Sequence, residues 1–419
     1  MKLAVDIIKK ILLTYITLLV TLTLAVIAVH FIPRQAICDN IISSTQLIEK
    51  EGFEHRFFGA NFLKLDNFTD TYMLNVMAGA DCSQPVNAAM MSYRFRNEEL
   101  EDFAPSTARL AQGDDSGVVR SSYARYWHGY QVVLRPLLTI MDLSAIRVLN
   151  FVVFSILIAT SLYLIKVKIS TAVALIFALS LLVMNFWIVP LSMQFSTCFH
   201  IMFVAIIAIL SSDRLTQNRA NRIATFFAIG AICSYFDFLT TPQITLGVPL
   251  IIYILAKNPQ SRWIETISLS TAWFMGYALF WVSKWGMLSL LTPNSIFDDA
   301  LGAVSERTST SYQHLDLSVG NLLQVGWASV ESRCGLVVVA CVVVALAILL
   351  YAKVLKSKQA FVQHSYLLLI SLFVPMWFFM LRNHSVMHRW FTWRALLVSL
   401  LSILLFIYYT TDLKKIFRR

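Results

Sequence analysis

Ten apolar segments, each close to the length that crosses a membrane, restrict the fold of this chain more than any other feature. They lie at about residues 11–31, 146–165, 171–191, 196–212, 222–240, 243–256, 264–290, 335–352, 360–381 and 392–410. About 20 apolar residues in a helix span the hydrocarbon core of a bilayer. A soluble domain cannot bury a chain that is 58% hydrophobic and only 14% charged. We therefore expect an all-α polytopic membrane protein with about ten transmembrane helices.

Basic residues mark one side of the expected membrane. Half of the 34 Lys and Arg residues fall in the two terminal segments and in four short connections. They are Lys2, Lys9, Lys10, Lys166, Lys168, Arg214, Arg219, Arg222, Lys257, Arg262, Lys353, Lys356, Lys358, Lys414, Lys415, Arg418 and Arg419. Short connections rich in Lys and Arg stay in the cytoplasm, so we expect both termini to be cytoplasmic. Because topology accounts for the net charge of +10, the sequence does not indicate a nucleic-acid partner.

The expected topology divides the chain into three parts. Residues 1–32 form the first transmembrane helix, and residues 33–142 form a large extracytoplasmic loop. Residues 143–419 form a membrane body of about nine helices, with a second external loop at 291–333. Apolar side chains at helical spacing, such as Tyr72 and Val76, predict short interfacial helices in the large loop. Cys38 and Cys82 share that loop, and whether they form a disulfide stays open.

Two acidic residues four positions apart follow the first span. Asp66 and Asp70 lie on one face if their segment is helical. A carboxylate at a membrane surface can act as a general base on an acceptor hydroxyl, or it can hold a divalent metal ion. The alternative is structural, with both acids solvated in the loop or Asp66 capping a helix that contains Asp70.

A basic and aromatic segment closes the large loop. On a helix, Arg125, His128 and Arg135 would lie within about 80° of one another. Guanidinium groups pair with phosphate oxygens in a bidentate manner, so this face suits a lipid phosphate. The alternative is an interfacial helix whose arginines reach the lipid headgroups.

Histidine and arginine gather again at residues 382–394, between the last two expected spans. His384 and His388 have the spacing of metal ligands on a helix, but the glutamate of HExxH zinc proteases is absent. Together with Arg382 and Arg394 they form a second candidate anion site at the outer face. The alternative is an external hairpin whose charges contact headgroups, although Arg394 would begin a span, where charge is costly.

Two further charges lie near the outer ends of expected spans and are secondary candidates, as is Arg382. Asp237 is a functional candidate because acidic residues inside membrane spans are costly. The alternative is that it lies at a helix end broken by Pro242. Lys284 is a candidate of the same kind near the end of the 264–290 segment.

These features together resemble the GT-C glycosyltransferases, which are integral membrane enzymes that use polyprenyl-phosphate-linked sugars. The resemblance rests on segments 66–70 and 125–129, on 383–385 with His388 and Arg394, and on the large loop after the first span. It implies an enzyme from an uncharacterised bacterial branch of this superfamily, which would act at the outer face of the inner (plasma) membrane. Asp66 or Asp70 would be the catalytic acid, with Arg125, Arg135 and Arg394 at the donor phosphate.

The same resemblance implies the classes of donor, acceptor and cofactor. The donor would be a polyprenyl-phosphate or polyprenyl-diphosphate sugar, and the acceptor a cell-envelope glycan, lipid or protein. No soluble nucleotide cofactor is implied, and a divalent cation such as Mg²⁺ or Mn²⁺ stays an open option. Two other functions remain: a transporter or flippase of a lipid-linked glycan, which would show broken helices near mid-membrane, and a non-catalytic partner in an envelope assembly complex.

Overall fold

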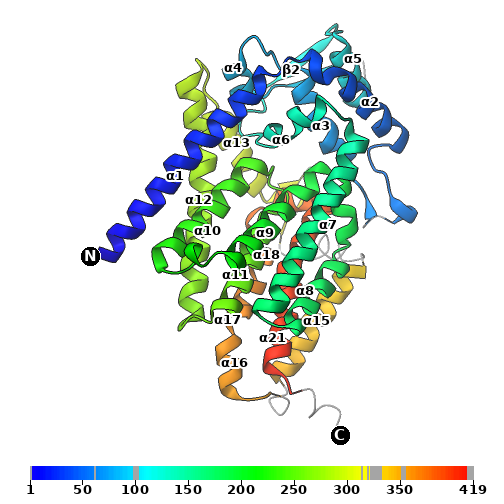
Figure 1. The fold of residues 1–419 in the computed structure, drawn as a ribbon. Helices are drawn as coiled ribbons and strands as arrows, with labels where there is room; N and C mark the ends of the chain where they lie inside the picture. The colour runs from blue at the N-terminus through cyan, green and yellow to red at the C-terminus, as the bar shows by residue number, and fades with distance from the viewer. Residues whose placement is uncertain are drawn as a thin grey trace.

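The computed structural model describes residues 2–60, 63–97, 103–312, 315–318, 320, 333–350 and 355–412, and helices dominate them (Figure 1). Two antiparallel strand pairs are the exceptions. β1 (Arg94–Asn97) pairs with β2 (Val118–Ser121), and β3 (Ser311–Tyr312) pairs with β4 (Leu315–Asp316). The expected helical class is confirmed. Most of the second expected loop beyond residue 320 lies outside the described residues, as do Lys353 and residues 413–419.

Four helical stretches in the described part of the chain are long and apolar enough to cross a membrane. They are α1 (Lys2–Ala28) with the 3-10 turn η1 (Val29–Phe31), α7 (Leu143–Lys168), α9 (Met193–Ser211), and the run of α20 (Arg389–Thr392), η7 (Trp393–Leu396) and α21 (Leu397–Thr410). A fifth is a pair bent by 41°, formed by α16 (Lys358–His364) with α17 (Tyr366–Ser371) and α18 (Phe373–Met380). The structure therefore supports four or five membrane-length helices, not the full set of ten.

The remaining expected spans are helical but differ in length or composition. α8 (Thr171–Val183), which the 3-10 helix η4 (Phe186–Leu191) follows, and α11 (Gln243–Lys257) are short for a bilayer. α10 (Arg219–Phe236) and α12 (Arg262–Leu291) do not combine the required length and apolar character. α15 (Arg333–Leu350) occupies the expected 335–352 segment.

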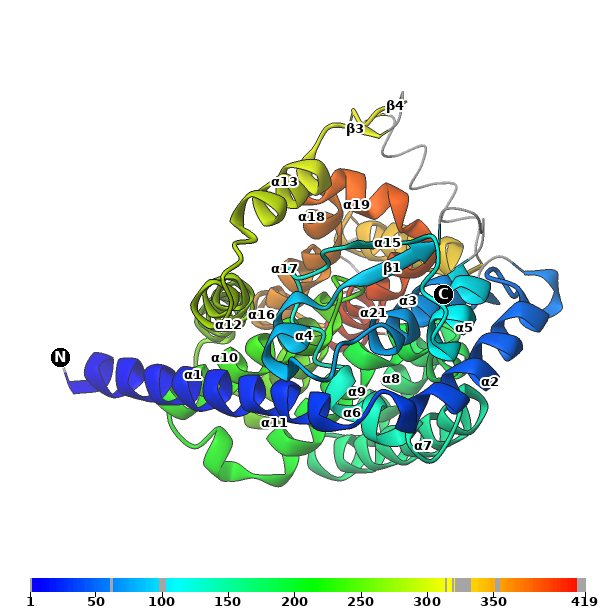
Figure 2. The same cartoon turned by 90° about the horizontal axis from the view of Figure 1, so that it is seen from above.

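The described residues between 34 and 142 form a helical cap over one end of the helix bundle (Figures 1 and 2). Its helices are α2 (Gln35–Glu51), η2 (Phe57–Gly59), α3 (Asn67–Ala78), α4 (Pro85–Met91), α5 (Phe103–Gln112) and α6 (Gln131–Leu138). Buried side chains such as Ile41, Leu74 and Leu138 give the cap its own apolar core. The short helices predicted from apolar spacing are present as α3 and α6.

The short basic connections meet at the other end of the bundle. Lys257 pairs with Asp213 of the 3-10 turn η5 (Asp213–Leu215) at 2.5 Å, and Lys10 of α1 donates to Asn221 of α10. Lys168 at the end of α7 is close enough to Asp213 to lower the pKa of that carboxyl, after the larger effect of Lys257. The two ends of the bundle thus differ: one carries the cap and the other carries the basic connections.

Two glycines allow α10 and α12 to pack closely. A Cβ atom at Gly230 would lie 2.0 Å from the Trp273 carbonyl oxygen, and one at Gly276 would lie 2.0 Å from the Phe227 carbonyl oxygen. Only glycine permits this backbone approach, and small residues at helix contacts are a common device of membrane helices. The close pair carries Lys284 of α12 up to the cap.

Candidate functional site

Asp70 joins the cap to the first turn of α9. The Ser192 hydroxyl and the Gln194 amide donate to Asp70 Oδ1, each at 3.1 Å, and the Met193 amide donates to Oδ2 at 3.2 Å. The carboxyl is fully buried. Burial raises its pKa from the ordinary 3.8 to about 7, against the opposing charge of Arg147, and Asp66 adds to the rise. Asp70 therefore supplies the N-terminal cap of a helix far away in the chain.

Asp66 caps its own helix, as one of the two interpretations of the sequence predicted. The Thr69 amide donates to Oδ1 at 3.1 Å and the Thr69 hydroxyl to Oδ2 at 2.7 Å, at the start of α3. Burial raises the pKa of Asp66, while Thr69 and more weakly the charge of Arg394 lower it. Arg394 thus lies near this acid, which brings two residues predicted from distant segments into one region.

A third residue of this region, Arg147, was not predicted. Its guanidinium donates to both carboxylate oxygens of Glu51 at 2.9 Å and to Asn67 Oδ1 at 2.7 Å, and it lies 3.9 Å from Asp70 Oδ2. The network links α2 and α3 of the cap to the start of α7 in the bundle. A signal was present in the sequence, because Arg147 begins an expected span in the same way as Arg394.

The 123–129 segment packs as a turn among aromatic rings. Arg125 pairs with Asp299 of α13 (Phe297–Thr308) at 3.3 Å, and its guanidinium lies 4.9 Å from the Tyr123 ring centroid. His128 is buried with a φ of 54°, and its ring Nε2 bonds the Tyr123 carbonyl at 2.7 Å. Burial lowers the pKa of His128 to about 3, so this imidazole is neutral at physiological pH and is no cation for a phosphate.

Arg135 is directed at the protein backbone. It donates to the carbonyl oxygens of Val29, Ile32 and Met77 at 3.1, 3.0 and 3.3 Å. It also lies 3.3 Å from Cys82 Sγ, and both Cys38 and Cys82 are free thiols. Arg135 therefore fastens the end of α1 to the end of α3. Its contacts, those of Arg125 and those of Arg394 lie in three separate environments.

The second cluster lies on α19 (Arg382–Met387) and the residues that follow it. His384 Nε2 bonds the Leu239 carbonyl at 2.9 Å, and its ring centroid is 4.6 Å from that of His388. Burial and then the charge of Arg307 lower the pKa of His388 to about 4, and burial lowers the pKa of His384 well below its usual value. The Nδ1 atoms of both rings are buried, with no hydrogen-bond partner among the described residues.

The arginines around α19 contact aromatic rings. Arg394 is buried, its guanidinium lies 4.1 Å from the Phe195 ring centroid, and it donates to the Trp390 carbonyl at 3.3 Å. Arg382 lies 4.2 Å from the Phe379 ring centroid and donates to the Phe379 carbonyl at 3.1 Å.

The two secondary candidates are buried at the cap side of the bundle. Lys284 donates to the Met90 carbonyl at 2.7 Å and to the Ala89 carbonyl at 3.3 Å. Its ammonium group therefore caps the C-terminal turn of α4 and is not directed at a ligand. Asp237 accepts the Thr240 amide with both oxygens, at 3.1 and 2.9 Å, in the turn after α10.

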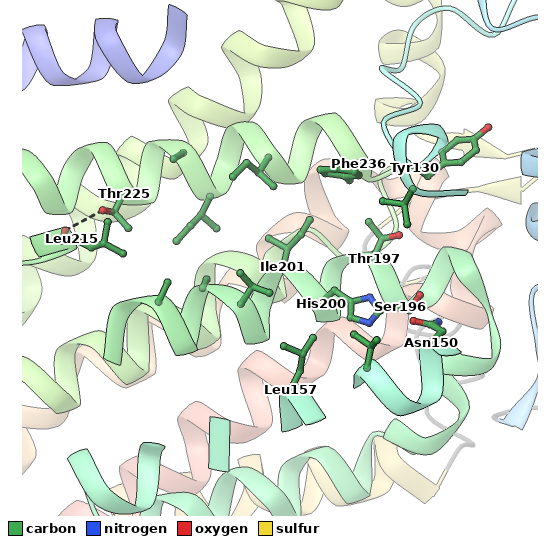
Figure 3. A pocket seen from close by; sticks show the side chains of 18 of the residues that line it. Tyr130, Asn150, Leu157, Ser196, Thr197, His200, Ile201, Leu215, Thr225 and Phe236 are labelled. Atoms are coloured by element: carbon green, nitrogen blue, oxygen red, sulfur yellow. Dashed lines mark hydrogen bonds between the residues drawn. The ribbon is translucent and has the colours of Figure 1, made fainter. Parts of the chain in front are cut away.

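A long apolar groove of about 1040 Å³ runs along α7, α9 and α10 (Figure 3). Its walls include Leu157, Ile201, Val204, Ala228, Ile232 and Phe236. Tyr130 and Met73 of the cap line one end, and Lys10 and Arg214 line the other. No motif in the sequence indicated this groove, because it forms between helices that are distant in the chain.

The cap end of the groove adjoins Asp70. The Met193 side chain lines the groove, while the amide of the same residue donates to the Asp70 carboxylate. Met73, three residues after Asp70 on α3, lines the groove as well. An apolar ligand in the groove would therefore end beside the region that holds Asp70, Asp66 and Arg147.

A comparison of the chain with protein-family models, with curated proteins and with solved structures found no match.

Proposed function

We propose that this protein is a membrane glycosyltransferase that moves a sugar from a polyprenyl-phosphate-type donor to a cell-envelope acceptor. The apolar groove is the observation that carries the proposal. A polyprenyl chain is long, flexible and apolar, and a groove of about 1040 Å³ along three helices suits such a chain. The groove leads to the cap, where the buried acids and arginines lie.

The proposal assigns different roles to the two acids. Asp70 is the candidate base, because a pKa of about 7 is close to that of an effective general base at neutral pH. Both oxygens of Asp66 cap α3, so this residue positions the helix that carries Asp70. Arg394, whose charge acts on Asp66, is the proposed cation for the donor phosphate. Arg125, predicted for the same role, pairs with Asp299 in a separate environment. Arg135, His128 and Lys284 support the framework instead.

The proposed topology has ten membrane-spanning segments, cytoplasmic termini and an extracytoplasmic cap in a bacterial inner membrane. The separation of the basic connections from the cap supports it. The acceptor would be a glycan, lipid or protein of the envelope, and a requirement for Mg²⁺ or Mn²⁺ remains a prediction.

The proposal is tested with purified protein in liposomes, radiolabelled polyprenyl-phosphate sugars and envelope fractions as acceptor. Wild-type protein should transfer label, and Asp70→Asn should reduce the rate by roughly 100-fold or more, as expected for loss of a general base. Ala228→Trp, which fills the groove, should raise the donor KM. Leu175→Trp, on the exposed face of α8, should leave the rate unchanged. No transfer by the wild-type protein with any donor would contradict the proposal.

Transport of a lipid-linked glycan is the second candidate, and the extent of the groove favours it. The groove has lining residues from both ends of the bundle, as a path across the membrane requires. The test follows a fluorescent polyprenyl-linked sugar in liposomes. Movement of this lipid across the bilayer only when the protein is present, without transfer of the sugar to an acceptor, would support the transporter.

A further inference from the structure

Two thiols and one carboxyl meet in the interior, away from the acids of the cap. Cys198 comes from α9, Cys233 from the last turn of α10, and Asp237 from the residue that ends α10. Their ligand atoms all lie within 4.8 Å of one another. The side chains are buried, with exposed fractions of 0%, 0% and 4%.

The helices fix this arrangement. Cys233 and Asp237 are four residues apart, so they lie on one face of the last turn of α10. Cys198 lies near the start of α9, and its Sγ lies within 4.8 Å of the Cys233 Sγ and of an Asp237 carboxylate oxygen. The three groups therefore converge on one point from two packed helices, without a long flexible side chain among them.

The spacing and the ligand types suit zinc. Zinc binds thiolate sulfur at about 2.3 Å and carboxylate oxygen at about 2.0–2.2 Å in a tetrahedral site, so neighbouring ligands lie roughly 3.5–3.8 Å apart. The three atoms would need to approach one another by at most about 1.0–1.3 Å. Thiolates select zinc over Mg²⁺ and Mn²⁺, which prefer oxygen ligands alone.

Binding would change the charge of the cluster. Thiolates rather than thiols hold zinc, so binding would release the two thiol protons, and the ion would leave one net negative charge on two thiolates and a carboxylate.

The position of the cluster indicates what a bound ion would do. Asp237 begins a turn in which Leu239 is buried with a φ of 70°, an unfavourable conformation for a leucine. The carbonyl of Leu239 accepts the bond from His384 of α19. An ion at Asp237 would fix this turn and, through it, the position of α19.

We propose that Cys198, Cys233 and Asp237 bind one zinc ion, which holds the cap-side ends of α9 and α10 together and orders the turn that contacts α19. The three side chains are buried between packed helices, so the proposed role of the ion is to hold those helices together. The inference is independent of the proposed glycosyl transfer.

The test measures zinc in the full chain, purified in detergent without added chelator. Wild-type protein should contain about one zinc per chain, and the double variant Cys198→Ser/Cys233→Ser should contain less than about a tenth of that. Cys341→Ser, at a free thiol on α15, is the matched control and should keep the zinc. Replacement by cobalt should give thiolate-to-cobalt absorption in the wild type and in the control.

A measurement on the wild type alone covers the case in which the double variant does not fold. Removal of zinc by a chelator should lower the unfolding temperature, and added zinc should restore it. Wild-type protein that is free of zinc and binds no cobalt would overturn the proposal. A disulfide between Cys198 and Cys233, found by mass spectrometry of the native protein, would overturn it as well.

Discussion

Asp66 and Asp70 lie four residues apart at the start of one helix, yet they bind different parts of the molecule. Asp66 closes its own helix, and its partner Thr69 is three residues away. Asp70 reaches the first turn of α9, more than a hundred residues along the chain. Local spacing could therefore predict the role of Asp66 as a cap, whereas the partner of Asp70 depends on how the cap sits on the bundle.

The raised pKa of Asp70 predicts a pH dependence of stability. In the unfolded chain this carboxyl titrates near 3.8, and in the folded protein near 7. The folded state thus holds its proton more tightly, so stability is greatest below the lower value and falls as the pH rises to the upper one. Between pH 5 and 8 the wild type should lose on the order of a few kcal/mol from this group.

Thermal unfolding in detergent across that pH range measures the effect. Asp70→Asn should be less stable at pH 5 and should show a much flatter dependence on pH. Ser192→Ala is the control, because it removes one hydrogen bond to Asp70 and leaves the titrating carboxyl in place. An equally steep pH dependence in Asp70→Asn would show that another group is responsible.

At the scale of elements, apolar segments in the sequence predicted where helices form but not how they break. The expected span 360–381 is a bent pair, and the span 171–191 ends its α-helix at Val183. Asn185 then adopts a φ of 52° and Pro190 lies in a 3-10 helix. Hydropathy reports which residues avoid water, and these breaks depend on backbone conformation instead.

The contact between α10 and α12 predicts a sharp difference between two glycines of one helix. Gly276→Ala would force a Cβ atom against the Phe227 carbonyl, and we expect a loss of about 1–3 kcal/mol or more in unfolding free energy. Gly286→Ala meets no atom within 4 Å, so it should be neutral or should stabilise the protein by up to about 1 kcal/mol. Thermal unfolding of both variants checks the prediction; equal stabilities would contradict the close packing.

At the scale of the whole molecule, the sequence predicted regions of the candidate site better than their contacts. Arg394, near the last span, is close enough for its charge to act on Asp66, near the first span. Arg135, by contrast, is occupied by backbone carbonyls, and the groove beside α9 had no counterpart in any motif. Such contacts join residues that are far apart in the chain, and local spacing carries no information about them.

The proposed orientation is tested by labelling single cysteines with a reagent that does not cross membranes. Asp115→Cys, at the exposed tip of the cap, should react in intact cells. Gln217→Cys, in the basic connection between α9 and α10, should react only after permeabilisation. The reverse pattern would place the cap in the cytoplasm and would remove the proposed donor.

The most direct test of the central claim is to identify the lipid in the groove. A photoreactive amino acid at Val204, which lines the groove, should crosslink a polyprenyl phosphate in native membranes, and added donor should compete with the crosslink. The same amino acid at Leu175, an exposed position on α8 outside the groove lining, should crosslink bulk phospholipid. Bulk phospholipid alone at both positions, insensitive to added donor, would contradict the account.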